Sequence, residues 1–173
     1  MAAGTIELKP QSFGIKGKKV PAGDRIRFGI IGVGMQGSGL LSNAITLPGA
    51  ECIGAADLYD GRHTLAKEIT GNPDLFTTRE YKKLLERKDI DCIIAAVPDH
   101  WHKRIVVDAC NAGKDVYIEK PMTHKVADGF EMIDAAKRNG RIVMAGSQRV
   151  SAMLCEKARE LYSSGGIGEV EHV

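Results

Sequence analysis

Short apolar runs of strand length alternate with helical segments along most of this chain, and that alternation constrains its fold more than any other feature. The apolar runs lie at 26–31, 51–56, 75–77, 91–97, 115–118 and 141–145. The segments with helical spacing lie at 38–47, 60–69, 79–87, 103–112, 123–139 and 152–162. Strands that alternate with helices in this way form βαβ units, whose strands are parallel and whose helices cover both faces of the sheet. The sequence therefore predicts an α/β fold with a doubly wound parallel sheet.

Two of the helical segments carry apolar stripes that we expect to face the core. In 103–112 the stripe consists of Ile105, Val106, Ala109 and Cys110, and Gly113 ends the helix. In 123–139 the stripe consists of Ala127, Phe130, Ile133 and Ala136.

The composition excludes several classes of protein. Hydrophobic residues make up 43% and charged residues 27% of the chain, which is ordinary usage for a globular domain. No apolar stretch approaches the ~18 residues of a membrane span. Lys and Arg (24) nearly balance Asp and Glu (22), and aromatic residues are only 5%, so neither charge nor stacking surface favours a nucleic acid. We expect no nucleic-acid partner and no membrane partner.

The cysteines and the N-terminal segment bear on the compartment. Cys52, Cys92, Cys110 and Cys155 form no CxxC pair, and no histidine stands at ligand spacing beside them. We expect small buried thiols rather than a metal site or disulfides. Residues 1–25 form a polar arm that we expect to be extended, and they lack the apolar core of an export signal. The expected location is cytoplasmic, or periplasmic if a leader has been removed.

A glycine motif directly follows the first predicted strand and directly precedes the first predicted helix. Gly32, Gly34 and Gly37, with Met35 and Gln36 before the last of them, form G-x-G-x-x-G. In this context Gly32 permits a tight turn, Gly34 lets the backbone approach a pyrophosphate, and Gly37 lets the helix pack close to the strand. The free N–H groups of the helix N-terminus favour phosphates. The motif predicts a dinucleotide site in a Rossmann-type fold.

An acidic residue stands where such a fold binds the adenosine ribose. Asp57 ends the second predicted strand, 20 residues after Gly37. A carboxylate there accepts hydrogen bonds from a ribose 2′-OH and repels a 2′-phosphate, which favours NAD over NADP. Arg62 follows five residues later, and its guanidinium could stack on adenine or neutralise a 2′-phosphate. NADP therefore stays open as the cofactor, and a solvated surface charge stays open for Arg62.

Two further clusters follow the fourth and fifth predicted strands, at the edge that lines the ligand crevice in open α/β sheets. The first is Val97-Pro98-Asp99-His100-Trp101-His102, in which we expect His102 to face the crevice. His100 and Trp101 could instead cap a helix and cover an edge. The second cluster is Glu119-Lys120-Pro121. Lys120 could serve in proton transfer or carbonyl polarisation, or form a structural ion pair with Glu119, and Pro121 could follow a cis bond.

Together the segments GIIGVGMQG and AVPDHWHKRIVVDACNAGKDVYIEKPM resemble the Gfo/Idh/MocA family, the glucose-fructose oxidoreductase and inositol dehydrogenase superfamily. The resemblance covers about residues 25–173, and the Glu-Lys-Pro strand end is its most specific local signature. It implies an oxidoreductase that acts on hydroxyl groups of sugars, cyclic polyols and related compounds with a tightly held NAD(P).

The resemblance also implies roles for single residues. The residues implied to bind the cofactor are Gly32, Gly34, Met35, Gln36, Gly37, Asp57, Arg62, Val97, Pro98, His102, Glu119 and Lys120. Lys120 is implied to be the catalytic lysine, which contacts both the nicotinamide ribose and the substrate hydroxyl. Trp101 and Arg149 are implied to face the substrate.

The chain departs from the family pattern at its C-terminus. Family members carry a second α/β domain, which covers the active site, supplies an Asp/His pair and usually forms the oligomer interface. This sequence stops where the first strand of that domain should begin. We therefore expect an arm at 1–25, a dinucleotide-binding domain at 26–150, and a linking helix with the start of the truncated domain at 151–173. We expect these residues alone to bind cofactor without useful turnover, and the complete protein to be a homo-oligomer.

Two other functions remain open. Some relatives use bound NAD transiently, so that their net reaction is glycoside hydrolysis. A dinucleotide-binding module without turnover is the third possibility.

Overall fold

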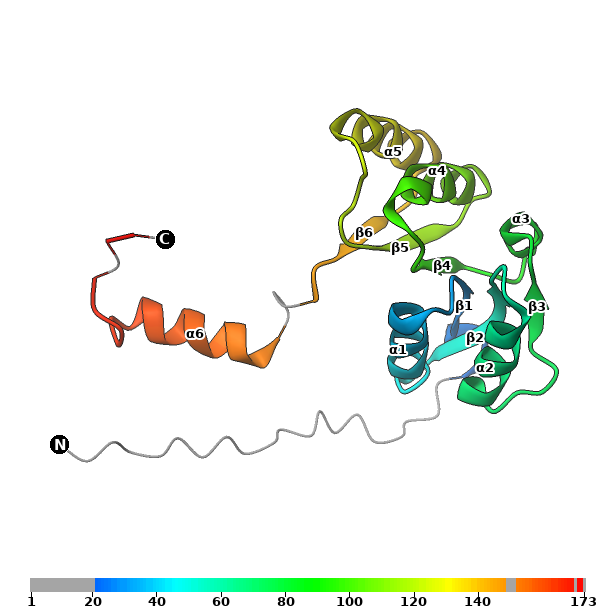
Figure 1. Cartoon of the computed structure of the whole chain (residues 1–173), viewed down its shortest axis with the longest axis horizontal. Helices are drawn as coiled ribbons and strands as arrows, with labels where there is room; N and C mark the ends of the chain where they lie inside the picture. Colours follow the sequence, from blue (N-terminus) through cyan, green and yellow to red (C-terminus); the bar gives the residue numbers. More distant parts are fainter. Residues whose placement is uncertain (1–20, 149–151, 170, 173) are drawn as a thin grey trace.

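The computed structural model describes residues 21–148, 152–169 and 171–172, and it contains one six-stranded parallel sheet (Figure 1). The strands are β1 (Ile26–Ile31), β2 (Ala50–Ala56), β3 (Phe76–Thr78), β4 (Cys92–Ala95), β5 (Asp115–Glu119) and β6 (Val143–Gly146). Their order in the sheet is β3-β2-β1-β4-β5-β6, which is the doubly wound order of a dinucleotide-binding fold. The predicted fold class is confirmed.

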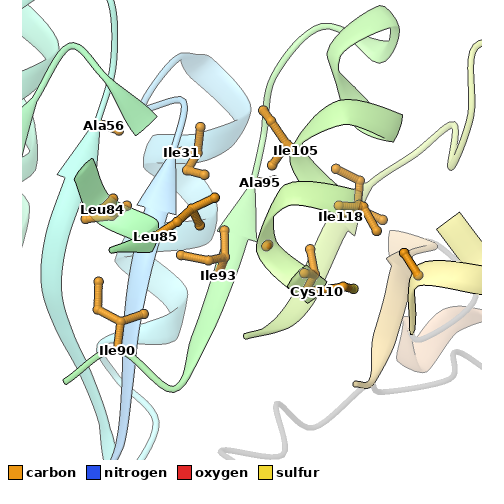
Figure 2. Packing of buried hydrophobic residues seen from close by; sticks show 14 of the residues in the cluster. Ile31, Ala56, Leu84, Leu85, Ile90, Ile93, Ala95, Ile105, Cys110 and Ile118 are labelled. Atoms are coloured by element: carbon orange, nitrogen blue, oxygen red, sulfur yellow. The ribbon is translucent and has the colours of Figure 1, made fainter. Parts of the chain in front are cut away.

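Helices cover both faces of the sheet. They are α1 (Met35–Ala44), α2 (Asp60–Thr70), α3 (Tyr81–Leu85), α4 (His102–Asn111) and α5 (Val126–Asn139). One core cluster joins α1 and α2 to the sheet and includes Ile30, Leu41 and Ala66. The other, drawn in Figure 2, lies beneath α3, α4 and α5 and includes Leu84, Ile93 and Ile105. The strands read as nearly continuous apolar runs because both of their faces are buried.

The stripe predicted for the fourth helical segment is confirmed. Ile105, Val106, Ala109 and Cys110 are buried on α4, and Gly113 follows the helix at φ 73°.

The stripe predicted for the helix that forms α5 is largely wrong, since only Ala136 of its four members packs against the core. Phe130 and Ile133 are exposed, and the buried residues of the helix are Gly129, Met132 and Ala135. The face that carries these three residues is buried because α5 packs against α4.

The two ends of the described chain differ from the Rossmann core. Residues 1–20 of the predicted arm lie outside the described residues, and Ala22–Asp24 form one 3₁₀ turn instead of an extended segment. Helix α6 (Met153–Ser163) has no buried residue and lies apart from the sheet in Figure 1. No helix in the described part of the chain is long and apolar enough to cross a membrane.

The four cysteines are free thiols in three different environments. Cys52 and Cys110 are buried and Cys92 is half-buried, whereas Cys155 on α6 is exposed, contrary to the expectation of four buried thiols. Burial raises the pKa of Cys52 and of Cys92 to about 11, and it also raises the pKa of Cys110.

We predict that one thiol reacts fast in the folded chain. At neutral pH a pKa near 11 reduces the thiolate fraction by about two orders of magnitude relative to a free cysteine, and burial also blocks the reagent. Titration with a chromogenic disulfide reagent should therefore detect one fast thiol in buffer and four in denaturant. Cys155→Ser is the control and should abolish the fast phase. Two or more fast thiols in the folded wild-type chain would contradict this packing.

Candidate functional site

A cleft of about 330 Å³ opens at the carboxyl ends of β1, β2 and β4. It lies over the β1–β4 junction, where the strand order reverses and where open α/β sheets bind their ligands. Its lining residues are Ile31, Gly32, Gly34, Ala56, Asp57, Leu58, Arg79, Tyr81, Ala96, Val97, Pro98, Trp101 and Ile105. The cleft brings together residues from three separate predicted clusters of the sequence: the glycine motif, Asp57 and the cluster after the fourth strand.

Two glycines of the motif are required by the fold of the chain itself. Gly32 has φ 85°, and a Cβ there would lie 2.4 Å from the carbonyl oxygen of Ala96. A Cβ at Gly37, on the first turn of α1, would lie 2.0 Å from the carbonyl oxygen of Gly32. No side chain fits at either position. Gly37 sets the distance between α1 and the end of β1, and Gly32 sets the distance between the ends of β1 and β4.

Gly34 has no such structural requirement. Its φ of −69° and ψ of −164° suit any residue, and an added Cβ would meet nothing within 4 Å. It faces the cleft at the N-terminus of α1, where the first N–H groups of the helix have no intrahelical acceptors. Met35 and Gln36 on this turn are both exposed. The open space and the free donors suit a phosphate group.

Asp57 is fixed at the edge of the cleft by two backbone donors. Its Oδ2 accepts a hydrogen bond from the N–H of Val33 (2.8 Å), and its Oδ1 accepts one from the N–H of Tyr59 (3.0 Å). The first bond ties the end of β2 to the glycine turn. Each carboxylate oxygen retains a lone pair that can accept a hydrogen bond from a ribose hydroxyl.

The arginine that lines the cleft is Arg79 rather than Arg62. Arg62 is half-buried on α2 and is absent from the lining. Arg79 directly follows β3 and donates from Nε to Asp60 Oδ1 (2.8 Å) and from Nη2 to Asp60 Oδ2. The sequence did not reveal this pair because its members are 19 positions apart and no local pattern marks the contact.

His102 does not face the cleft, and that expectation is corrected. Its side chain is 1% exposed, with Nδ1 2.7 Å from the carbonyl oxygen of Pro121 and Nε2 2.9 Å from that of Val97. The ring therefore joins the loop after β4 to the loop after β5. Two carbonyl partners for two ring nitrogens make His102 a structural bridge between the two candidate clusters.

Trp101 lies in the wall of the same cleft as Gly32 and Asp57, and its implied contact with the substrate stays a prediction. Val97 and Pro98 line the cleft with it.

Tyr81, a lining residue that the sequence did not single out, donates to Asp108 on α4 (Oη to Oδ2, 2.6 Å). Burial and this bond raise the pKa of Tyr81 to about 12, so its hydroxyl stays protonated.

Glu119 is a buried carboxylate that collects three donors from three parts of the chain. Its Oε1 accepts from the side-chain amides of Gln36 (3.0 Å) and Gln148 (2.9 Å), and its Oε2 accepts from the N–H of Lys120 (3.1 Å). The ion pair with the Lys120 ammonium does not form among the described residues. Glu119 thus links the first turn of α1 to the ends of β5 and β6, and Gln148 is a partner that the sequence did not reveal.

Lys120 is exposed at the carboxyl end of β5, where it is free to approach a ligand that extends past the cleft. The peptide bond between Lys120 and Pro121 is cis, as the sequence allowed. Arg149, the other residue implied to face the substrate, lies outside the described residues. No group of three or more possible metal ligands occurs in the described ranges.

Comparison with known proteins agrees with this fold. Residues 26–147 match the profile of the Gfo/Idh/MocA oxidoreductase family, described as having an NAD-binding Rossmann fold. An uncharacterized oxidoreductase of Streptococcus pneumoniae serotype 4 is 31% identical over 145 residues, which are 84% of this chain and 38% of that protein. A glycosyl hydrolase family 109 protein of Shewanella pealeana is 31% identical over 137 residues, which are 75% of this chain and 30% of that protein.

Solved structures show the same similarity. An NAD-binding protein from Listeria innocua superposes with a TM-score of 0.76 at 27% identity, covering 84% of this chain and 42% of that one. Myo-inositol 2-dehydrogenase from Lactobacillus plantarum gives a TM-score of 0.75 at 26% identity, covering 84% and 43%. The chain thus spans less than half the length of each of these proteins.

We predict that Gly34→Ala weakens NAD binding without harming the fold. The added methyl group occupies the space beside the helix N-terminus, so the dissociation constant should rise about tenfold, or ~1.4 kcal/mol. Gly39→Ala is the matched control, since Gly39 lies on the same helix and its Cβ would also meet nothing within 4 Å. It should leave the affinity unchanged and raise stability by ~0.5–1 kcal/mol. Calorimetric titration and thermal unfolding measure both effects, and equal affinities of the two variants would contradict the assignment.

Proposed function

This chain belongs to the Gfo/Idh/MocA oxidoreductase family, and on that premise we propose that it is the cofactor-binding part of an NAD-dependent oxidoreductase acting on a CH–OH group of a sugar or cyclic polyol. The family profile is NAD-binding, and one of the similar structures is an inositol dehydrogenase. The substrate class is our inference from these similarities, because the chain spans 38% of the oxidoreductase that it resembles.

The proposal rests on one observation, which is that Gly34 and Asp57 line the same cleft. Gly34 leaves open space at free helix N–H groups, which suits a pyrophosphate. Asp57 stands at the end of the neighbouring strand with its carboxylate already oriented by Val33 and Tyr59, which suits a ribose diol. The residues present therefore fit NAD, which when bound supplies the nicotinamide ring as hydride acceptor or donor.

The proposed catalytic group is Lys120. Its ammonium is exposed at the strand end next to the cleft, so it can hold or release a proton at Nζ beside a substrate hydroxyl. Glu119 orients the backbone at this point through the N–H of Lys120, and His102 holds the following loop through the carbonyl of Pro121. We propose positioning roles for both residues, because neither presents a free polar atom to the cleft.

A second candidate function is NAD-assisted glycoside hydrolysis. It is favoured by the similarity to glycosyl hydrolase family 109 proteins and to an alpha-N-acetylgalactosaminidase of Shewanella oneidensis, which is 28% identical over 151 residues. The two functions differ in net cofactor use. A dehydrogenase accumulates reduced cofactor in proportion to product, whereas a hydrolase of this kind releases a sugar with no net change in absorbance of the cofactor.

We predict that the chain binds NAD more tightly than NADP and that Asp57 sets the preference. Asp57→Asn removes the negative charge and one acceptor, so NAD affinity should fall about tenfold while NADP affinity falls less or rises. Asp74→Asn, at an exposed turn before β3, is the matched loss of charge and should change neither affinity. Tighter binding of NADP than of NAD by the wild-type chain would contradict the role of Asp57.

A further prediction concerns turnover in the complete protein of which we propose this chain to be a part. Lys120→Met should lower kcat by roughly 10²–10⁴, the usual contribution of a positioned acid–base group. The dissociation constant for NAD should change much less, since the proposed phosphate and ribose contacts lie elsewhere. Lys125→Met removes a second exposed lysine five residues away and is the control. Near-normal turnover by Lys120→Met would remove this lysine from the mechanism.

A further inference from the structure

An exposed ion pair borders the adenosine side of the cleft and is used by none of the steps above. Asp60, the first residue of α2, binds the Arg79 guanidinium through both of its carboxylate oxygens. The bond to Arg79 holds the pKa of the Asp60 carboxyl below its usual value, so the pair is fully charged at neutral pH. The ring Nδ1 of His63 lies 3.7 Å from the same carboxylate.

The register of the sheet places this pair beside Asp57. Ala56 pairs with Thr78, and the N–H of Asp57 donates to the carbonyl of Thr78 (3.1 Å). Arg79, the residue directly after β3, is therefore level with Asp57, and both residues line the cleft. Asp60 follows Asp57 by three residues and contacts Arg79 from outside the lining of the cleft.

The charges of Asp57, Asp60 and Arg79 together determine the electrostatic environment of a ribose bound at this edge of the cleft. A free guanidinium beside Asp57 would attract a 2′-phosphate and offer it bidentate hydrogen bonds. In this chain the Nε and one N–H of Nη2 of Arg79 face Asp60, whose carboxylate balances the positive charge of the guanidinium. A phosphate would meet only the remaining Nη donors and would lie near two carboxylates. Like charges at this spacing disfavour the phosphorylated ribose, whereas a neutral hydroxyl meets no such cost.

The pair has little to contribute to folding. The side chains of Arg79 and Asp60 are 63% and 65% exposed, and exposed ion pairs add little to stability because water and salt screen them. A role in ligand selection is consistent with that exposure, since a group at the mouth of a cleft contacts the ligand and solvent alike.

We propose that Asp60 is a specificity-determining residue for the cofactor: by holding Arg79, it keeps the only arginine in the described lining of the cleft from binding a 2′-phosphate. This inference rests on the proposed function, because it presupposes that the cleft binds the adenosine end of a dinucleotide. It assigns to Arg79 the latent affinity for NADP that the sequence had left open for Arg62.

The test compares dissociation constants for NAD and NADP by calorimetry in the wild-type chain and in Asp60→Asn. The substitution keeps the shape of the side chain but releases the guanidinium, so the NAD-over-NADP preference should fall about five- to tenfold. The change should shrink near 1 M salt, where the Debye length is ~3 Å. Asp60→Ser, which removes the carboxylate with a shorter side chain, should shift the preference in the same direction.

Two double variants identify the cation. Adding Arg79→Met to Asp60→Asn should abolish the gain in NADP affinity, whereas adding Arg62→Met should preserve it. An unchanged preference in Asp60→Asn and Asp60→Ser, or a gain that survives Arg79→Met, would overturn the inference while leaving NAD binding intact. Failure of the wild-type chain to bind NAD at all would instead overturn the proposed function, so the two failures are distinguishable.

Discussion

The cleft depends on one close contact, between the first turn of α1 and the end of β1. A Cβ at Gly37 would lie 2.0 Å from the carbonyl oxygen of Gly32, so the helix can approach the strand only because position 37 has no side chain. That approach aims the free N–H groups of α1 at the space over the β1–β4 junction. It also brings Gln36 within hydrogen-bond distance of Glu119, and Val33 within that of Asp57. The close contact between Gly37 and Gly32 thus positions the N–H groups of α1 proposed to bind phosphate and Asp57, proposed to bind the ribose. It also positions Gln36 beside Glu119, which accepts a hydrogen bond from the backbone N–H of Lys120.

The architecture could be predicted from the sequence because strands buried on both faces and helix-ending glycines are local signals. The strand at Ile26–Ile31 matches its predicted bounds, and Gly71 and Gly140 end α2 and α5 in the left-handed conformation. Helix α1 begins at Met35, three residues earlier than predicted, because its glycines weaken the local helical signal while packing on β1 stabilises it. The error at α5 has another origin. Its sequence carries two apolar stripes, and the contact with α4, which no local pattern specifies, buries the stripe of Gly129, Met132 and Ala135.

The site was predictable where a motif specifies backbone geometry and unpredictable where it depends on contacts distant in sequence. The glycines and Asp57 lie where the spacing indicated. His102 was expected in the crevice because a histidine at a strand end resembles a ligand contact, but its ring is buried with each nitrogen next to a backbone carbonyl oxygen. The pair of Asp60 with Arg79, and the amide of Gln148 on Glu119, join segments 19 and 29 residues apart, and no local pattern marks such contacts.

The strand order has a consequence for the lifetime of the chain in a cell. Within the described sheet, β3-β2-β1 and β4-β5-β6 meet along one seam, between β1 and β4, and the cleft lies across that seam. A molecule in the cleft contacts residues from both sides of it, so occupancy favours the closed sheet over any opening of the seam by RT ln(1 + [L]/Kd). The supply of cofactor would then set how often the two halves separate, and with it how often proteases meet an unfolded segment.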